Sequence, residues 1–218
     1  MAARRPSRAE AGLPDAGFVF CCFNNNYKIT PDVFDVWMRL LQRVTGSVLW
    51  LLEDNAVASR NLRLEAEARG VRADRLVFAA RMLPPDHLAR HRLAELFLDT
   101  LPCNAHTTAS DALWAGLPVL TCRGHAFPGR VAASLLRAVG LPELITENLA
   151  DYETLALKLA TTPALLADIK SRLARNRTTY PLFDIDRYRR HIESAYITMY
   201  GRYQRAEMPQ GFSVEPMQ

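Results

Sequence analysis

Short apolar runs alternate with amphipathic stretches along residues 18–160 of the chain. A continuous apolar run is typical of a parallel strand buried on both faces, whereas apolar residues at helical spacing indicate a helix packed on such a sheet. The alternation therefore predicts an α/β fold, a parallel sheet with helices on both faces. The expected strands lie at 18–23, 48–52, 76–78, 96–98, 119–121 and 143–145.

Capping residues mark the expected helices. Thr30 precedes Pro31, so a helix is expected to begin there with the Thr30 hydroxyl as its cap. Gly70 is a plausible stop for the helix that follows the second strand. A further helix is expected over 84–92, and two or three helices without strands are expected over 151–205.

Composition divides the chain into three parts. Residues 1–17 are small, polar and Arg-bearing, which predicts a flexible linker, and 206–218 resemble a disordered tail. Residues 18–205 form one expected domain. The sequence has no signal-peptide core and no apolar stretch of membrane length, and its four cysteines fit neither a disulfide scaffold nor zinc. We expect a cytoplasmic protein with reduced thiols and no membrane contact.

The charge balance is mildly basic, with a formal net charge of +4. This excess favours anionic ligands. The arginines are spread along the expected helices, and no basic patch with interleaved aromatic residues is visible, so nucleic acid is not an expected partner. No acid pair, G-x-S-x-G motif or Walker lysine motif points to a hydrolase or a P-loop enzyme.

Three polar loops, 24–28, 79–87 and 99–111, each follow an expected strand. The carboxyl ends of parallel strands meet at one edge of the sheet, and open α/β sheets bind ligands at that edge. The loops therefore define the candidate site.

The most informative stretch is 103–118, a small-residue loop followed by a helix that begins near Thr107 or Thr108. Backbone N–H groups at a helix start, beside two hydroxyls and the His106 imidazole, suit a phosphate. Asp111 lies one turn further on, where a carboxylate can accept hydrogen bonds from a sugar ring. Together these residues predict a site for a nucleotide that carries a diphosphate.

Each of these features also has a purely structural interpretation. Thr108 and Asp111 have the spacing of a capping box. The loop that contains Lys28 is also an Asn-rich turn, although a lysine at this edge can neutralise a leaving diphosphate. His87, in the first turn of a helix, is more typical of a solvated surface residue. The glycine-bearing loop 123–130 is either a mobile loop near the ligand or a simple connection.

Several ordered segments, 23–29, 98–100, 103–116 and 130–136, resemble the C-terminal catalytic half of the O-linked N-acetylglucosamine transferase and SPINDLY-type glycosyltransferases. The amino-acid sequence of residues 103–116 is more similar to that of bacterial members of this group than to that of animal members. The resemblance implies a GT-B fold, in which two Rossmann-like halves enclose the active site and the C-terminal half binds most of the UDP. It also implies that no catalytic metal and no cofactor is used, because the UDP-sugar is the donor substrate.

The resemblance implies roles for seven positions. Lys28 is expected to be the catalytic group, contacting the diphosphate and stabilising the departing UDP. Pro84 departs from the pattern, because animal members carry a nucleotide-contacting lysine there. The other six positions are expected to bind the donor: His106, Thr107 and Thr108 at the phosphates, Asp111 at the ribose, His87 near the uracil, and Asn25 beside the donor.

The expected function is that of the donor-binding half of an inverting transferase that moves N-acetylglucosamine from UDP-GlcNAc to Ser or Thr hydroxyls of a protein acceptor. The implied partners are a missing N-terminal catalytic half and tetratricopeptide repeats. Three alternatives remain: the same fold with GDP-fucose or UDP-glucose as donor, a nucleotide-binding module that is catalytically incomplete, and an Arg-driven nucleic-acid binder.

Overall fold

Six parallel strands form one sheet in the computed structural model, which describes residues 6–216. Their order is β3-β2-β1-β4-β5-β6, and β1 lies between β2 and β4, with Phe20 opposite both Leu49 and Leu96. Every predicted strand is present, which confirms the Rossmann-like α/β fold. The strands are β1 (Val19–Cys22), β2 (Val48–Leu52), β3 (Leu76–Ala79), β4 (Leu96–Leu98), β5 (Val119–Cys122) and β6 (Ile145–Thr146).

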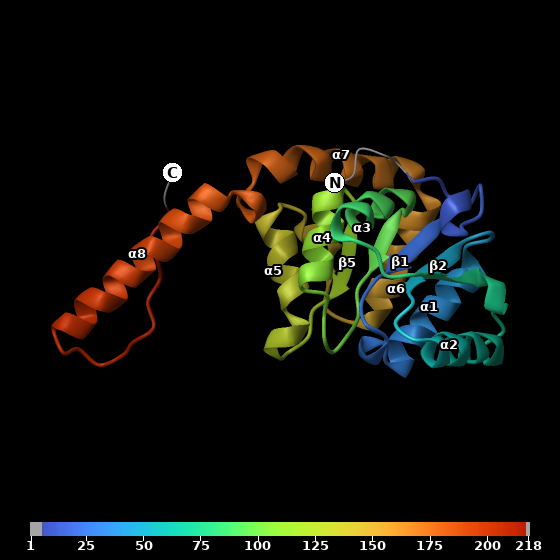
Figure 1. The fold of residues 1–218 in the computed structure, drawn as a ribbon, viewed down its shortest axis with the longest axis horizontal. Coiled ribbons are helices and arrows are strands. Elements are labelled where there is room, and N and C mark those ends of the chain that lie inside the picture. Colours follow the sequence, from blue (N-terminus) through green and yellow to red (C-terminus); the bar gives the residue numbers. More distant parts are fainter. Residues whose placement is uncertain (1–5, 217–218) are drawn as a thin grey trace.

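Helices cover both faces of the sheet (Figure 1). On one face α1 (Pro31–Arg43) packs between α2 (Ala56–Ala68) and α6 (Leu149–Thr161). On the other face α3, α4 and α5 lie side by side, at Pro84–Arg90, Thr107–Ala115 and Val131–Ala138. The helix α7 (Pro163–Thr179) contacts both α6 and α4, so it joins the two layers at one end of the sheet.

The core fills both faces of the sheet, and its largest fully buried side chains include Trp37, Trp50 and Tyr152. The Trp37 indole of α1 donates a hydrogen bond of 3.3 Å to the Tyr152 hydroxyl of α6. That hydroxyl in turn donates to the carbonyl oxygen of Asp99, at 3.0 Å, just beyond the end of β4. The core is thereby linked by hydrogen bonds to the carboxyl edge of the sheet.

The described terminal segments differ in how they contact this body. Within the expected linker, Leu13 is buried in the core and Arg8 forms an ion pair of 2.8 Å with Glu95, while residues 1–5 lie outside the described residues. The last helix, α8 (Ile185–Gln204), projects away from the body, and none of its residues is buried (Figure 1). Residues 217–218 of the expected tail also lie outside the described residues.

Several predicted boundaries need correction. Thr30 is at the N-cap of α1, but its hydroxyl donates to the carbonyl oxygen of Leu101 at 3.1 Å instead of capping the helix. The helix predicted over 84–92 ends at Arg90, and a 3-10 turn follows it. The sixth strand begins only at Ile145, because Pro142 lacks the N–H that a strand needs and opens a 3-10 turn.

A glycine at the end of α5 generates a stability prediction. Gly140 has φ of +73°, and a Cβ there would overlap the ring of Tyr180. Gly46 has nearly the same φ, +72°, but a Cβ there meets nothing within 4 Å. We expect Gly140→Ala to lower the free energy of unfolding by roughly 2–4 kcal/mol, and Gly46→Ala by only about 1 kcal/mol. Urea denaturation measures both, and equal losses would contradict the packing argument.

Candidate functional site

The strand order reverses direction between β1 and β4, so their carboxyl ends form the topological switch point of the sheet. The loop after β1 carries Asn24, Asn25 and Lys28, and the loop after β4 runs from Asp99 to His106. Because the six strands are parallel, the three predicted polar loops do lie at one edge. The two loops at the switch point also bond to each other.

Asp99 is the centre of this arrangement and is only 2% exposed. Its Oδ1 accepts the backbone N–H groups of Thr100 at 2.8 Å and Ala105 at 2.6 Å. Its Oδ2 accepts the hydroxyl of Thr121, in β5, at 2.6 Å. Burial raises the pKa of Asp99 to about 7, although the hydrogen bonds of these partners act to lower it. One carboxylate therefore fixes the fold of the loop before α4.

Asn24 connects that carboxylate to the start of α4. Its Nδ2 donates to the Thr100 hydroxyl at 2.8 Å and lies 3.4 Å from Asp99 Oδ1. Its Oδ1 accepts the hydroxyl of Thr108 at 2.5 Å. The capping-box interpretation of Thr108 and Asp111 is therefore wrong: α4 begins at Thr107 with His106 at the N-cap, and no described side chain caps it.

Lys28 reaches across the switch point to the same loop. Its Nζ donates to the carbonyl oxygen of Asn104 at 2.8 Å, two residues before His106. The Asn104 side chain is buried and donates to the carbonyl of Thr100 at 2.8 Å. An ammonium has three N–H donors, so this contact fixes Lys28 beside the helix start and leaves donors for a ligand.

The loop after β5 borders the start of α4 on another side. The carbonyl oxygen of Pro128 accepts the backbone N–H of Asn104 at 2.8 Å and lies 3.2 Å from His106 Nε2. A carbonyl only accepts, so His106 Nε2 carries a proton here. A Cβ on Gly129 would lie 2.7 Å from the carbonyl of Pro102, so this connection requires glycine to pack against the loop before α4.

The remaining predicted residues of this cluster offer free polar groups. Thr107 is exposed, and Asp111 is partly buried, which raises the pKa of its carboxyl. Neither side chain has a hydrogen-bond or ion-pair partner among the described residues. Asn25 lies at the N-cap of the 3-10 turn that contains Lys28, with its Nδ2 3.3 Å from the Tyr27 hydroxyl.

His87 is half-buried rather than a solvated surface residue. Its ring lies 5.3 Å from the ring of Phe23, which directly precedes Asn24, and 4.7 Å from the ring of His91. Burial, with a smaller effect of Arg90, lowers the pKa of His87 to about 4. The ring is therefore uncharged at neutral pH and joins the β1 loop through its contact with Phe23.

Arg90, the last residue of α3, is a buried cation close to His87. It is 3% exposed, donates to the carbonyl of Ala80 at 2.6 Å and lies 4.4 Å from the ring centre of Phe23. Its Nε and Nη2 have no partner among the described residues, and neither has the indole nitrogen of Trp50. Both side chains line a cavity of about 680 Å³ with Ala79, Ala80, Met82 and Asp86.

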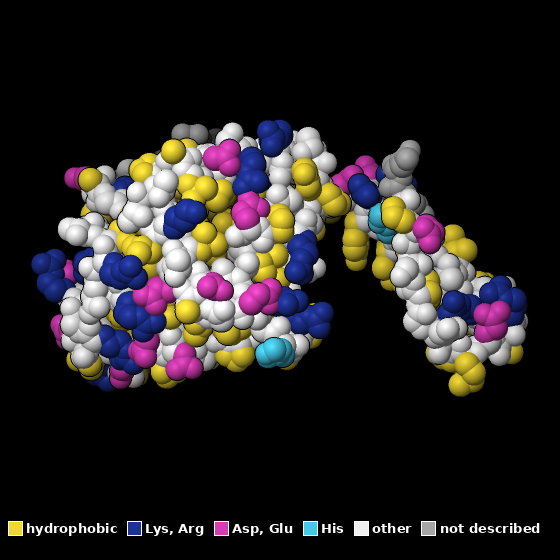
Figure 2. Space-filling model, turned by 180° about the vertical axis from the view of Figure 1, so that it is seen from behind, with side chains coloured by type: hydrophobic (Ala, Val, Ile, Leu, Met, Phe, Trp, Pro, Cys, Tyr) yellow, Lys and Arg dark blue, Asp and Glu magenta, His cyan; other side chains and the backbone are white. Residues whose placement is uncertain are grey.

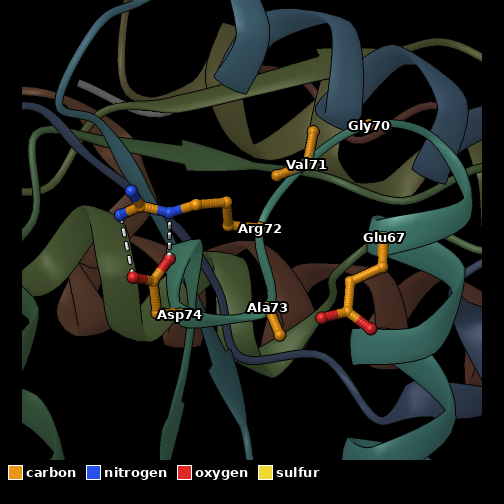
Figure 3. A pocket seen from close by; sticks show the side chains of 6 residues that line it. All are labelled: Glu67, Gly70, Val71, Arg72, Ala73 and Asp74. Atoms are coloured by element: carbon orange, nitrogen blue, oxygen red, sulfur yellow. Dashed lines mark hydrogen bonds and ion pairs between the residues drawn. The ribbon is translucent and has the colours of Figure 1, made fainter.

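A second hollow, of about 570 Å³, lies away from this edge (Figure 3). Its lining residues, 67 and 70–74, connect α2 to the amino end of β3, opposite the carboxyl edge. Arg72 and Asp74 pair with each other there, at 3.1 and 2.8 Å. Arg72 and Asp74 are paired with each other in this open hollow. It has neither a lysine nor an uncapped α-helix start like those at the switch point.

Among the described residues, charged side chains, metal-ligating groups and apolar helices indicate no further site. Figure 2 shows basic and acidic side chains interspersed over one face of the body, as the scattered arginines of the sequence predict. Within residues 6–216, no group of three or more His, Cys, Asp and Glu side chains is placed to hold a metal ion. Nor does any described helix combine the length and apolar content that a membrane span requires.

The sheet order and the polar switch point define the class of the protein, a Rossmann-like domain with a GT-B-like fold. The chain belongs to glycosyl transferase family 41, whose sequence profile matches residues 4–192. A solved structure of a mutant O-GlcNAc transferase from Thermobaculum terrenum superimposes with a TM-score of 0.80 and 34% identity. The alignment covers 84% of this chain and 36% of that one, and it confirms the resemblance drawn from the sequence.

Curated relatives agree with this assignment. The chain is 38% identical to the probable UDP-N-acetylglucosamine–peptide N-acetylglucosaminyltransferase SEC of Arabidopsis thaliana, over 96% of this chain and 22% of that protein. It is 34% identical to the probable transferase SPINDLY of Solanum lycopersicum, over 88% of this chain and 21% of that protein. The chain thus spans about a fifth of the length of these relatives.

The raised pKa of Asp99 generates a pH prediction. Because this pKa is about 7 in the folded chain and near 3.8 when unperturbed, the stabilisation linked to Asp99 is full below about pH 4 and is lost as pH rises through about 7. Asp99→Asn cannot ionise. We expect the free energy of unfolding of the wild type, relative to that of the variant, to fall by on the order of a few kcal/mol over this range.

Urea denaturation at a series of pH values measures this difference. Burial lowers the pKa of His87 to about 4 and that of His91 to about 3, so both destabilise the fold as pH falls below about 6.5. Their effect is common to both proteins and cancels in the difference. A difference that stays constant with pH would show that Asp99 titrates as in the unfolded chain.

Proposed function

We propose that this chain is the donor-nucleotide-binding half of an inverting protein O-glycosyltransferase that uses UDP-N-acetylglucosamine. The observation that carries the proposal is the contact between Lys28 Nζ and the carbonyl of Asn104, which joins a cation to the uncapped start of α4. The two residues are 76 positions apart in the sequence. Membership of glycosyl transferase family 41 supports the same reaction class.

In this proposal Lys28 is the catalytic residue. Its free N–H donors bind the diphosphate and stabilise the negative charge that develops on UDP as the bond to the sugar breaks. The backbone N–H groups in the first turn of α4 bind the same phosphates, aided by the helix dipole. His106 and Thr107 border these phosphates, and no metal or other cofactor takes part.

Other residues of the candidate site bind the nucleoside. The unpartnered carboxylate of Asp111 accepts hydrogen bonds from the ribose hydroxyls. The uncharged ring of His87 lies against the uracil, and Asn25 contributes an amide beside the donor.

The acceptor and the remaining catalytic groups belong to the rest of the enzyme. The relatives that are named as peptide N-acetylglucosaminyltransferases are about five times as long as the matched region. We infer that an N-terminal catalytic half closes the cleft over the donor, and that tetratricopeptide repeats hold the protein whose Ser or Thr hydroxyl receives the sugar.

Lys28→Ala tests the proposed cation. A charged hydrogen bond to a phosphate is lost, so we expect the Kd for UDP to rise about tenfold or more while the chain stays folded. Isothermal titration calorimetry measures the affinity, and circular dichroism checks the fold. Lys158→Ala is the matched control, because Lys158 is exposed on α6 and forms no contact in the switch-point loops. Equal Kd values for the wild type and Lys28→Ala would refute the role of Lys28.

The choice of nucleotide separates UDP-sugar donors from GDP-fucose. A ligand that binds only the folded chain raises its Tm, by an amount that grows with ligand concentration over Kd. We expect millimolar UDP to raise the Tm and the same concentration of GDP to leave it nearly unchanged, with phosphate-matched CDP as a further control. A larger shift with GDP would favour the fucose donor instead.

A further inference from the structure

We propose that Asn24 is a positioning residue for the donor site: its amide oxygen accepts the hydrogen bond of the Thr108 hydroxyl, so that Thr108 offers a bound diphosphate only its backbone N–H. This inference rests on the proposed function and deepens it. It changes the role of Thr108, whose hydroxyl the family resemblance assigns to the phosphates, and it adds a residue that the resemblance did not single out.

The orientation of the Asn24 amide follows from its partners. The side chain is buried, with 3% exposure. The hydroxyl of Thr100, 2.8 Å away, donates its own proton to the carbonyl of Cys103 at 2.7 Å, so it accepts from Asn24. The carboxylate of Asp99 is likewise an acceptor when ionised. The NH2 group must therefore face these two residues, and the amide oxygen must face Thr108.

The proton of the Thr108 hydroxyl is then fixed as well. An amide oxygen carries no hydrogen, so the 2.5 Å contact requires Thr108 Oγ1 to be the donor. A hydroxyl has one proton. A diphosphate ester in a nucleotide-sugar is an acceptor only, so it can form no hydrogen bond with this hydroxyl while the contact to Asn24 persists. The backbone N–H of Thr108 remains available in the first turn of α4.

The same contact fixes where the helix begins. Asn24 and Thr108 are 84 residues apart, and their bond ties the end of β1 to the first turn of α4. The bonds of Asn24 to Asp99 and Thr100 tie both to the end of β4. Without Asn24, the first turn of α4 loses its side-chain connection to β1, and its backbone donors are held less firmly for the phosphates.

Thr107 provides an internal comparison. It is adjacent in sequence, exposed, and its hydroxyl has no partner among the described residues. A direct contact of the Thr107 hydroxyl with a phosphate would be independent of Asn24. The two threonines therefore differ in a measurable way: the effect of Thr108 on the donor depends on Asn24, and that of Thr107 does not.

A double-mutant cycle measured as the Kd for UDP tests the inference. We expect Asn24→Ala and Thr108→Val each to weaken binding about threefold to tenfold, and the double variant to bind no more weakly than Asn24→Ala alone. Thr108→Ser, which keeps the hydroxyl, retains the wild-type affinity. In the parallel cycle, Thr107→Val and Asn24→Ala multiply their effects. Circular dichroism verifies each fold, and Asn24→Ser replaces Asn24→Ala if the latter fails to fold.

Multiplicative losses in the cycle of Asn24 and Thr108 would overturn the inference, because they would mean that the Thr108 hydroxyl contacts the ligand directly. The proposed function would survive that result, since UDP would still bind the wild-type chain. A wild-type chain that binds no UDP would instead overturn the proposed function, and this inference with it.

Discussion

The buried carboxylate of Asp99 is the interaction on which the site depends. Two oxygens accept hydrogen bonds from the end of β4, from the loop before α4 and from β5. A loop that follows a buried strand must satisfy its backbone N–H groups without water. Here Asp99 does this for Thr100 and Ala105, and the turn that results aims the chain into α4 with its first N–H groups uncapped.

Two side chains of the core hold the backbone of Asp99 in place. The Tyr152 hydroxyl donates to the backbone carbonyl of Asp99, and Trp37 donates to Tyr152. Tyr152 is on α6, which follows the last strand of the sheet. A helix that lies on the far face from α4 is therefore part of what holds the switch point rigid, since a hydrogen-bonded chain runs from one layer to the other.

Much of the fold could be predicted because parallel strands buried on both faces leave a strong signal, a continuous apolar run. The same reasoning located the polar loops at one edge, which is a consequence of parallel strands alone. The hydrogen-bond partners of hydroxyl groups could not be predicted. Thr30 and Thr108 both had local capping patterns, yet their hydroxyls bond to Leu101 and Asn24, 71 and 84 residues away. Local spacing carries no information about such contacts.

The candidate site shows the same division. Lys28, His106 and Thr107 could be assigned to the carboxyl edge of the sheet from the sequence, because each follows a predicted strand and lies before, or at the start of, the next helix. The burial of His87 against Phe23 could not, since it depends on how α3 crosses the end of β1. Asp99 and Asn24 both stood in segments that carried the family resemblance, and a polar residue directly after an apolar strand was the signal that could have identified them.

A carboxylate beneath the proposed phosphate site would be electrostatically unfavourable, and its hydrogen bonds explain why it is nevertheless suitable. Thr100 and Ala105 present backbone N–H donors to Oδ1, and Thr121 presents a hydroxyl to Oδ2, so the ionised carboxylate accepts at both of its oxygens. The raised pKa of Asp99 is the cost of that burial. The ammonium of Lys28, fixed to the same loop through Asn104, supplies positive charge at the side where a diphosphate would bind. Asp99 determines the conformation of the loop, and Lys28 supplies positive charge beside it. The two residues therefore act on different properties of one site.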